Sequence, residues 1–188
     1  MTCNLYVTQL STQNRLGSSL SGSAGFPPVG AADTAGAVGG SVDQPYEGAW
    51  VSGTHRFALR VYFEDTDTAG IVYYANYLKF MERARSDMLR AGGIDQRAVL
   101  EAGEGVYVVA EARLKYHRSA RLDDALVVAS GVQAVRAASC VIHQRVMRGE
   151  ELLVDATITA AFVDSEGRPK RQPREWTQTF ERLRKGME

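Results

Sequence analysis

Four strand-like segments that follow one another almost without interruption constrain the fold of this chain most. They cover residues 106–117, 126–135, 139–148 and 152–163, and the joints between them are only a few residues long. Connections this short join antiparallel neighbours, because a parallel crossover needs about a dozen residues or more. The sequence therefore predicts antiparallel strands joined by hairpins over this part of the chain.

One further strand and one long helix precede this run. Apolar and polar residues alternate over 55–63, which is the period of a half-buried strand. Residues 75–91 carry apolar side chains at helical spacing and are followed by two glycines, and a short second helix is expected over 95–102 with Asp95 as its N-cap. The predicted class is α+β, with a five-stranded antiparallel sheet and one long helix on one face.

Residues 1–53 differ in composition from the rest of the chain. They hold 9 of the 18 glycines and few charged residues. Such a segment buries too little apolar surface to offset the entropy of ordering the chain. We therefore expect a flexible extension over 1–53, without an assigned role, and a single domain over 54–188.

Composition and charge limit the classes of function. The 22 basic and 22 acidic residues balance, which argues against a nucleic-acid binder that relies on a basic face. No apolar run approaches the roughly 18 residues of a membrane span, and the first residues do not resemble an export signal. The two cysteines lie far apart, so a cytoplasmic protein with a small-molecule ligand is expected. Because one helix cannot cover both faces of five strands, self-association is expected as well.

The chemistry-bearing part of the sequence is the loop over 64–70, which holds three carboxylates just before the long helix. A helix start offers free N–H groups that stabilise an oxyanion, and a carboxylate upstream can act as base or nucleophile toward the same point. The same residues also suit a capping or solvated turn, and a metal site is a weaker third reading. The three histidines and Cys140 are interpreted as packing or surface residues.

Several motifs in this region resemble those of the 4-hydroxybenzoyl-CoA thioesterase family, which has the hotdog fold. They are RVYFEDTD over 60–67, GIVYYANY over 70–77, ERAR over 82–85 and YHRSARLDD over 116–124. The resemblance is closest to the acyl-CoA thioesterase branch associated with the Tol-Pal system of the cell envelope. It covers the chain from about Arg56 onward.

The resemblance implies a sheet wrapped around the long helix, dimers paired edge to edge, and hydrolysis of acyl-CoA without metal or cofactor. It implies that Asp67 is the catalytic carboxylate, as nucleophile or general base, and that the Tyr74 amide polarises the thioester carbonyl. Members of the Tol-Pal branch often have histidine at the position of Tyr74. The resemblance and the local chemistry together assign substrate binding to seven residues: Gly70, Val72, Tyr73, Tyr77, Lys115, Arg118 and Arg121.

Two other functions remain open. One is an acyl-thioester hydratase or dehydratase, which normally brings a histidine to the start of the helix, and no histidine lies between Arg56 and Tyr116. The other is a non-catalytic hotdog partner protein of a cell-envelope or lipid-synthesis complex. The expected assembly is a homodimer or homotetramer.

Overall fold

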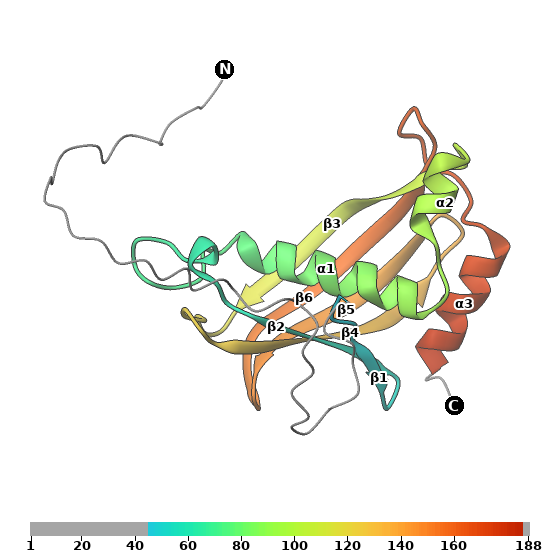
Figure 1. The fold of residues 1–188 in the computed structure, drawn as a ribbon. Helices are drawn as coiled ribbons and strands as arrows, with labels where there is room; N and C mark the ends of the chain where they lie inside the picture. The colour runs from blue at the N-terminus through green and yellow to red at the C-terminus, as the bar shows by residue number, and fades with distance from the viewer. Residues whose placement is uncertain (1–44, 186–188) are drawn as a thin grey trace, which may run out of the picture. The chain divides into compact units, whose positions relative to one another are not determined.

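The computed structural model describes residues 45–185, which form one antiparallel sheet with helices on its inner face (Figure 1). The strands are β1 (Ala49–Val51), β2 (Thr54–Arg60), β3 (Val106–Tyr116), β4 (Ala125–Val135), β5 (Ser139–Arg148) and β6 (Glu151–Val163). The helices are α1 (Asn76–Ala91), α2 (Gln96–Glu101) and α3 (Arg174–Lys185), with a short 3-10 turn, η1, at Phe63–Asp65. The predicted α+β class, the long helix and the second helix with its Asp95 cap are confirmed.

The order of strands in the sheet is β1-β2-β4-β5-β6-β3. The hairpins β4–β5 and β5–β6 are confirmed, but the predicted hairpin between β3 and β4 is wrong, since β3 pairs with β6 and β4 pairs with β2. The segment between β3 and β4 crosses beneath the start of α1, where the Ala120 N–H donates to the Tyr77 hydroxyl (2.8 Å). Short joints indicate antiparallel direction, but not which strands are neighbours.

The sheet has six strands instead of the predicted five, because Ala49–Val51 pairs with Thr54–Arg60. These residues belong to the stretch that the sequence assigned to the flexible extension. The Gly48 N–H donates to the Asp87 carboxylate of α1 (2.7 Å), so the hairpin is tied to the long helix. The rest of the predicted extension, residues 1–44, lies outside the described residues.

The core lies between α1 and the concave face of the sheet. Tyr77, Phe80, Met81, Ala84 and Met88 line the buried side of α1. The sheet bends around the helix, with β-bulges in β3, β4 and β6 that increase the local twist.

A third helix, which the sequence analysis missed, closes the far end of this core. Trp176, Phe180 and Leu183 lie on one side of α3 and pack with Met88, Leu89 and Ile94 from the end of α1 and the turn after it. Their spacing is the helical signal that could have predicted α3.

Strand β3 forms an open edge of the sheet. Each of its eleven residues is exposed or half-buried, and the exposed ones include Val106, Val108 and Val109. Natural proteins rarely leave a long apolar edge uncovered, because its free N–H and C=O groups pair with other chains.

Candidate active site

The loop that carries Asp67 is held by its own main chain. The Asp67 N–H donates to the Ile71 carbonyl (2.9 Å), the Asp67 carbonyl accepts from Gly70 N–H (3.0 Å), and the side chain accepts from Ala69 N–H (2.8 Å). Gly70 has a φ of +70°, in the left-handed region that favours glycine. The carboxylate of Asp67 is therefore exposed but fixed in position.

Asp65 and Asn76 join this loop to the start of α1. The Asp65 carbonyl accepts from both the Tyr73 N–H and the Asn76 side-chain amide, each at 2.9 Å. The Asp65 side chain is buried and accepts from Tyr62 N–H (2.9 Å). Asp65 thus acts as a structural residue, and of the three loop carboxylates only Asp67 lines a cavity.

The start of α1 leaves main-chain donors without side-chain caps. Ala75 precedes the helix in a helical conformation and provides no capping side chain. Among residues 45–185, the Tyr74 N–H has no hydrogen-bond acceptor. A free donor at this end of a helix suits an oxygen that gains negative charge.

The segment after β3 forms the opposite wall. The Tyr116 hydroxyl donates to the Tyr74 carbonyl (3.2 Å), and Tyr116 packs edge-to-face on Tyr77 with ring centroids 5.8 Å apart. Behind this wall, Arg148 donates to the Asp124 carboxylate (2.7 Å). Burial raises the pKa of Asp124, but hydrogen bonds from the Arg121 amide and Arg148 outweigh it, so the pKa lies below its ordinary value.

These elements enclose a groove of about 410 Å³. Its lining residues are Asp67, Ile71, Val72, Tyr73, Tyr74, Tyr77, Tyr116, His117, Arg118 and Ser119. The structure thus brings together six of the nine residues that the sequence proposed for the site.

The other three proposed residues lie elsewhere. Gly70 is in the turn that shapes the Asp67 loop. Lys115 lies between Leu114 and Tyr116 in β3, so its side chain projects from the opposite face of the sheet. Arg121 lies outside the groove lining, and its N–H donates to Asp124 (2.8 Å).

Four lining residues were missed from the sequence: Ile71, Tyr116, His117 and Ser119. Tyr116 could have been found, because it shares the inner face of β3 with Leu114 two residues earlier. His117 could not, since its approach to the groove depends on how the segment after β3 crosses under α1.

Several of the residues that line the groove are tyrosines, whose hydroxyls can form hydrogen bonds. A hydrogen bond with Tyr74 raises the pKa of Tyr73, to which the negative charge of Asp67 also contributes. Burial raises the pKa of Tyr77 and of Tyr116. These hydroxyls therefore stay protonated at neutral pH and act as hydrogen-bonding groups beside the carboxylate.

An antiparallel sheet wrapped around a central helix is the hotdog architecture, and known proteins of this class match the chain. The pattern of the thioesterase-like superfamily matches residues 61–181. The acyl-CoA thioesterase YbgC of Haemophilus influenzae is 40% identical over 68% of this chain and 95% of its own length.

Solved structures agree with this assignment. A probable thioesterase from Bartonella henselae is 35% identical, with a TM-score of 0.61 over 64% of this chain and 99% of its own. A 1,4-dihydroxy-2-naphthoyl-CoA thioesterase from Synechocystis shares the fold at 21% identity, with a TM-score of 0.64 over 68% of this chain and 96% of its own.

The chain belongs to the thioesterase-like superfamily, and its similarity to YbgC confirms the branch indicated by the sequence motifs. Within residues 45–185, no helix combines the length and apolarity needed to cross a membrane. The same residues contain no cluster of three or more side chains suited to metal binding.

Proposed function

We propose that this protein hydrolyses acyl-CoA thioesters in the groove between the Asp67 loop and the start of α1. The observation that carries the proposal is that a fixed carboxylate and a free main-chain donor, Asp67 and the Tyr74 N–H, share one groove. The names of the curated relatives, acyl-CoA thioesterase and acyl-CoA thioester hydrolase, support the same reaction.

The reaction needs one group to deliver an oxygen and another to hold the developing charge. The Asp67 carboxylate either attacks the thioester carbon or takes a proton from an attacking water. The carbonyl oxygen becomes an oxyanion that accepts a hydrogen bond from the Tyr74 N–H. Collapse of this intermediate breaks the carbon–sulfur bond and releases CoA as thiolate. In the nucleophilic route, water then hydrolyses the acyl-Asp67 anhydride.

The remaining lining residues suggest how the substrate lies. Val72 and the rings of Tyr73 and Tyr77 provide an apolar wall for the acyl group. Arg118 is exposed at the rim, where its guanidinium can meet a CoA phosphate. We propose Arg118 as the main phosphate contact, with Lys115 and Arg121 reaching at most the outer part of CoA.

A homodimer paired through β3 is part of this proposal. Tyr74 is 59% exposed and Tyr73 45%, so one chain alone leaves the groove open to water. A second β3 would cover the free edge next to Tyr116 and bring another chain close to the groove. Association into tetramers, a cytoplasmic location and partners in a cell-envelope or lipid-synthesis complex stay predictions.

Thiol release from short-chain, long-chain and aromatic acyl-CoAs tests the proposed chemistry. Asp67→Asn is expected to lower kcat at least about a hundredfold while CoA binding is retained. Glu64→Gln is the matched control, because Glu64 is an exposed carboxylate of the same loop that does not line the groove. Equal turnover in Asp67→Asn would reject the assignment, and no turnover of any thioester by the wild type would favour a non-catalytic partner.

The position of His117 gives the hydratase alternative a specific test. The absence of histidine between Arg56 and Tyr116 argued against that reaction, but the fold brings His117 to the groove. Wild type and His117→Asn should be compared on an enoyl-CoA and on its saturated analogue. Hydration of the enoyl-CoA that depends on His117 would establish the alternative. Hydrolysis of both thioesters that depends on Asp67 would exclude it.

A further inference from the structure

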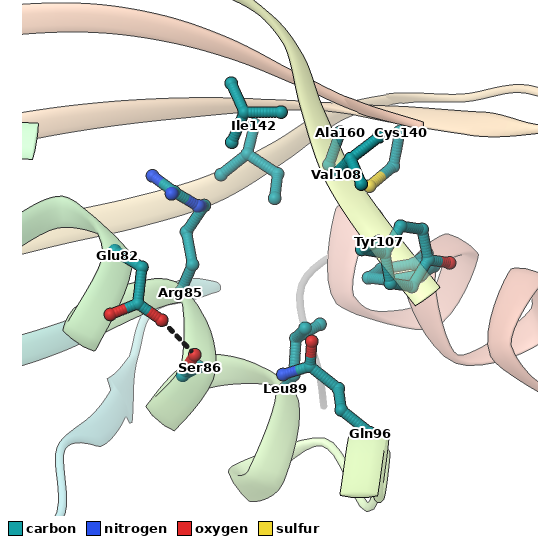
Figure 2. A pocket seen from close by; sticks show the side chains of 12 residues that line it. Glu82, Arg85, Ser86, Leu89, Gln96, Tyr107, Val108, Cys140, Ile142 and Ala160 are labelled. Atoms are coloured by element: carbon teal, nitrogen blue, oxygen red, sulfur yellow. Dashed lines mark hydrogen bonds between the residues drawn. The ribbon is translucent and has the colours of Figure 1, made fainter. Parts of the chain in front are cut away.

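A second cavity, of about 130 Å³, lies between the middle of α1 and the edge strand β3 (Figure 2). Its walls are mostly apolar and come from Leu89, Val108, Val109, Ile142 and Ala160, with neighbours in β3, β5 and α3. The polar groups on its α1 side are Glu82, Arg85 and Ser86. This cavity lacks the proposed catalytic carboxylate and is separate from the groove.

Arg85 is a half-buried cation without a carboxylate partner among residues 45–185. Its guanidinium donates to the Gln144 side-chain oxygen (2.8 Å), and Gln144 is fully buried and held by the Met81 carbonyl and the Ser130 hydroxyl. Burial lowers the pKa of Arg85 and outweighs the attraction of the Glu82 charge, which raises it. A guanidinium placed this way is costly unless an anion approaches it.

Glu82 is an anion that lacks an ion-pair partner in the same way. Its carboxylate is exposed, accepts a hydrogen bond from the Ser86 hydroxyl (2.7 Å), and pairs with no cation among the described residues. Figure 2 shows the Glu82 carboxylate turned to Ser86 and the guanidinium of Arg85 reaching toward Ile142. One anion and one cation thus lie three positions apart on the side of α1 that faces the open edge; the charge of Glu82 acts on Arg85, but the two side chains form no ion pair.

The alignment of α1 with β3 indicates which groups can pair with Glu82 and Arg85. Tyr77 packs on Tyr116 at one end, and Leu89 lines the cavity with Tyr107 at the other, so helix and strand run antiparallel. The position halfway between Tyr77 and Leu89 is residue 83, between Glu82 and Arg85. It lies level with residues 111–112, at the middle of β3.

Two copies that pair antiparallel through the full length of β3 are related by a two-fold axis at the middle of the strand. Such an axis passes level with the interval between Glu82 and Arg85. In a two-fold interface, a contact from one residue to another occurs twice, once in each direction. Opposite charges on either side of the axis are therefore self-complementary.

We propose that Glu82 and Arg85 pair with Arg85 and Glu82 of a second copy of this chain across the β3 edge. The second copy thereby closes the cavity beside Arg85. This inference rests on the dimer in the proposed function and not on its chemistry. It adds to that dimer the charges that select the partner and its register.

Charge reversal in two separate proteins tests the proposal. In Glu82→Arg all four facing side chains of a homodimer are cations, and in Arg85→Glu all four are anions. Each variant is expected to dimerise at least about tenfold more weakly than the wild type, because like charges meet. An equimolar mixture restores opposite pairs at both positions, so it should form a heterodimer with near wild-type affinity. Sedimentation equilibrium and native mass spectrometry measure both quantities.

Arg83→Glu is the matched control, since Arg83 is exposed on α1 and does not line the cavity. It should dimerise like the wild type. If Arg85→Glu does not fold, Arg85→Gln in the Glu82→Arg background replaces it, and removal of the like charges should recover most of the lost affinity.

The proposal is overturned if both reversals dimerise as tightly as the wild type, if the mixture fails to recover, or if the wild type is monomeric. It is also overturned if Arg85→Gln leaves the dimer intact and selectively slows an acyl-CoA with a terminal carboxylate. Thiol release in the same samples separates the two proposals. A dimer that shows the expected charge response but cleaves no thioester would contradict the proposed function. It would leave the proposed dimer contacts standing.

Discussion

The two ends of helix α1 differ in whether their polar groups are exposed or buried. At its start, Tyr73, Tyr74 and Asp67 are exposed around a groove and a main-chain donor is left unpaired. Near its end, His55 is fully buried, and Asp87 is 5% exposed as a side chain. Polar groups left open at one end suit a ligand, whereas the buried contact of His55 with Asp87 at the other end helps to hold the fold together, even though His55 Nδ1 has no hydrogen-bond partner among residues 45–185.

The buried end joins the β1–β2 hairpin to the helix. His55 Nε2 lies 3.1 Å from Asp87 Oδ2, and the same carboxylate oxygen accepts from Gly48 N–H. Trp50 packs edge-to-face on the His55 ring, with centroids 5.3 Å apart. Changes here should therefore alter stability, and changes around the groove should alter turnover.

The largest effect on stability is expected from Phe180→Ala. Phe180 is fully buried among Tyr107, Trp176 and the end of α1, so its truncation loses burial and leaves a cavity. The free energy of unfolding should fall by about 3 to 5 kcal/mol, measured by urea denaturation. Phe63→Ala is the control, since Phe63 is 82% exposed and should shift the same quantity by less than about 0.5 kcal/mol.

The buried histidine predicts a pH dependence of stability. Burial lowers the pKa of His55 and outweighs the nearby Asp87, which raises it. The unfolded chain therefore takes up a proton near pH 6.5 that the folded chain resists, so stability is complete above that pH and decreases below it. Between pH 7.5 and 5.5, His55 should contribute a loss of about 1 kcal/mol to the free energy of unfolding.

A histidine variant isolates this contribution. His55→Gln should show a smaller decrease in stability over the same pH interval than the wild type. Equal slopes in the two proteins would show that His55 does not cause the pH dependence.

The sequence predicted some elements of the fold and missed others. Periodicity located the helix and the four later strands; α1, β4, β5 and β6 each have a buried face with a regular spacing, whereas β3 has none. It missed α3, although Trp176, Phe180 and Leu183 carry the same signal, and it missed β1, whose three residues are too few to show a period. The pairing of β3 with β6 depends on how the sheet curves, which no local pattern encodes.

The candidate site likewise contains residues that local motifs predicted and residues that depend on the fold. Motifs selected Asp67, Tyr74 and their neighbours, all within one short segment of chain. His117 and Tyr116 join them through the crossing of a distant segment, held by the Tyr77 hydroxyl. Lys115 was proposed for its charge and its place in sequence, but the alternation of side chains in β3 directs it to the other face of the sheet.

A smaller effect is expected from Gly70→Ala in the turn beside Asp67. No atom lies within 4 Å of an added Cβ, but the φ of +70° strains any residue with a side chain. The unfolding free energy should fall by about 1 kcal/mol. Gly131→Ala is the control, since Gly131 also has open space but lacks a positive φ, and it should not be destabilised. A Gly70→Ala protein as stable as the wild type would mean that the turn relaxes.

The smallest change in stability is expected where the largest change in activity is proposed. The amide oxygen of Asp67→Asn can still accept from Ala69 N–H, as the carboxylate does at 2.8 Å, so the loop keeps its conformation. The free energy of unfolding should therefore stay within about 0.5 kcal/mol of the wild-type value, although thiol release falls about a hundredfold. Thermal or urea unfolding of the same preparations used for kinetics measures this. If Asp67→Asn lost several kcal/mol, the carboxylate would belong to the framework of the fold, and the contrast between the two ends of α1 would fail.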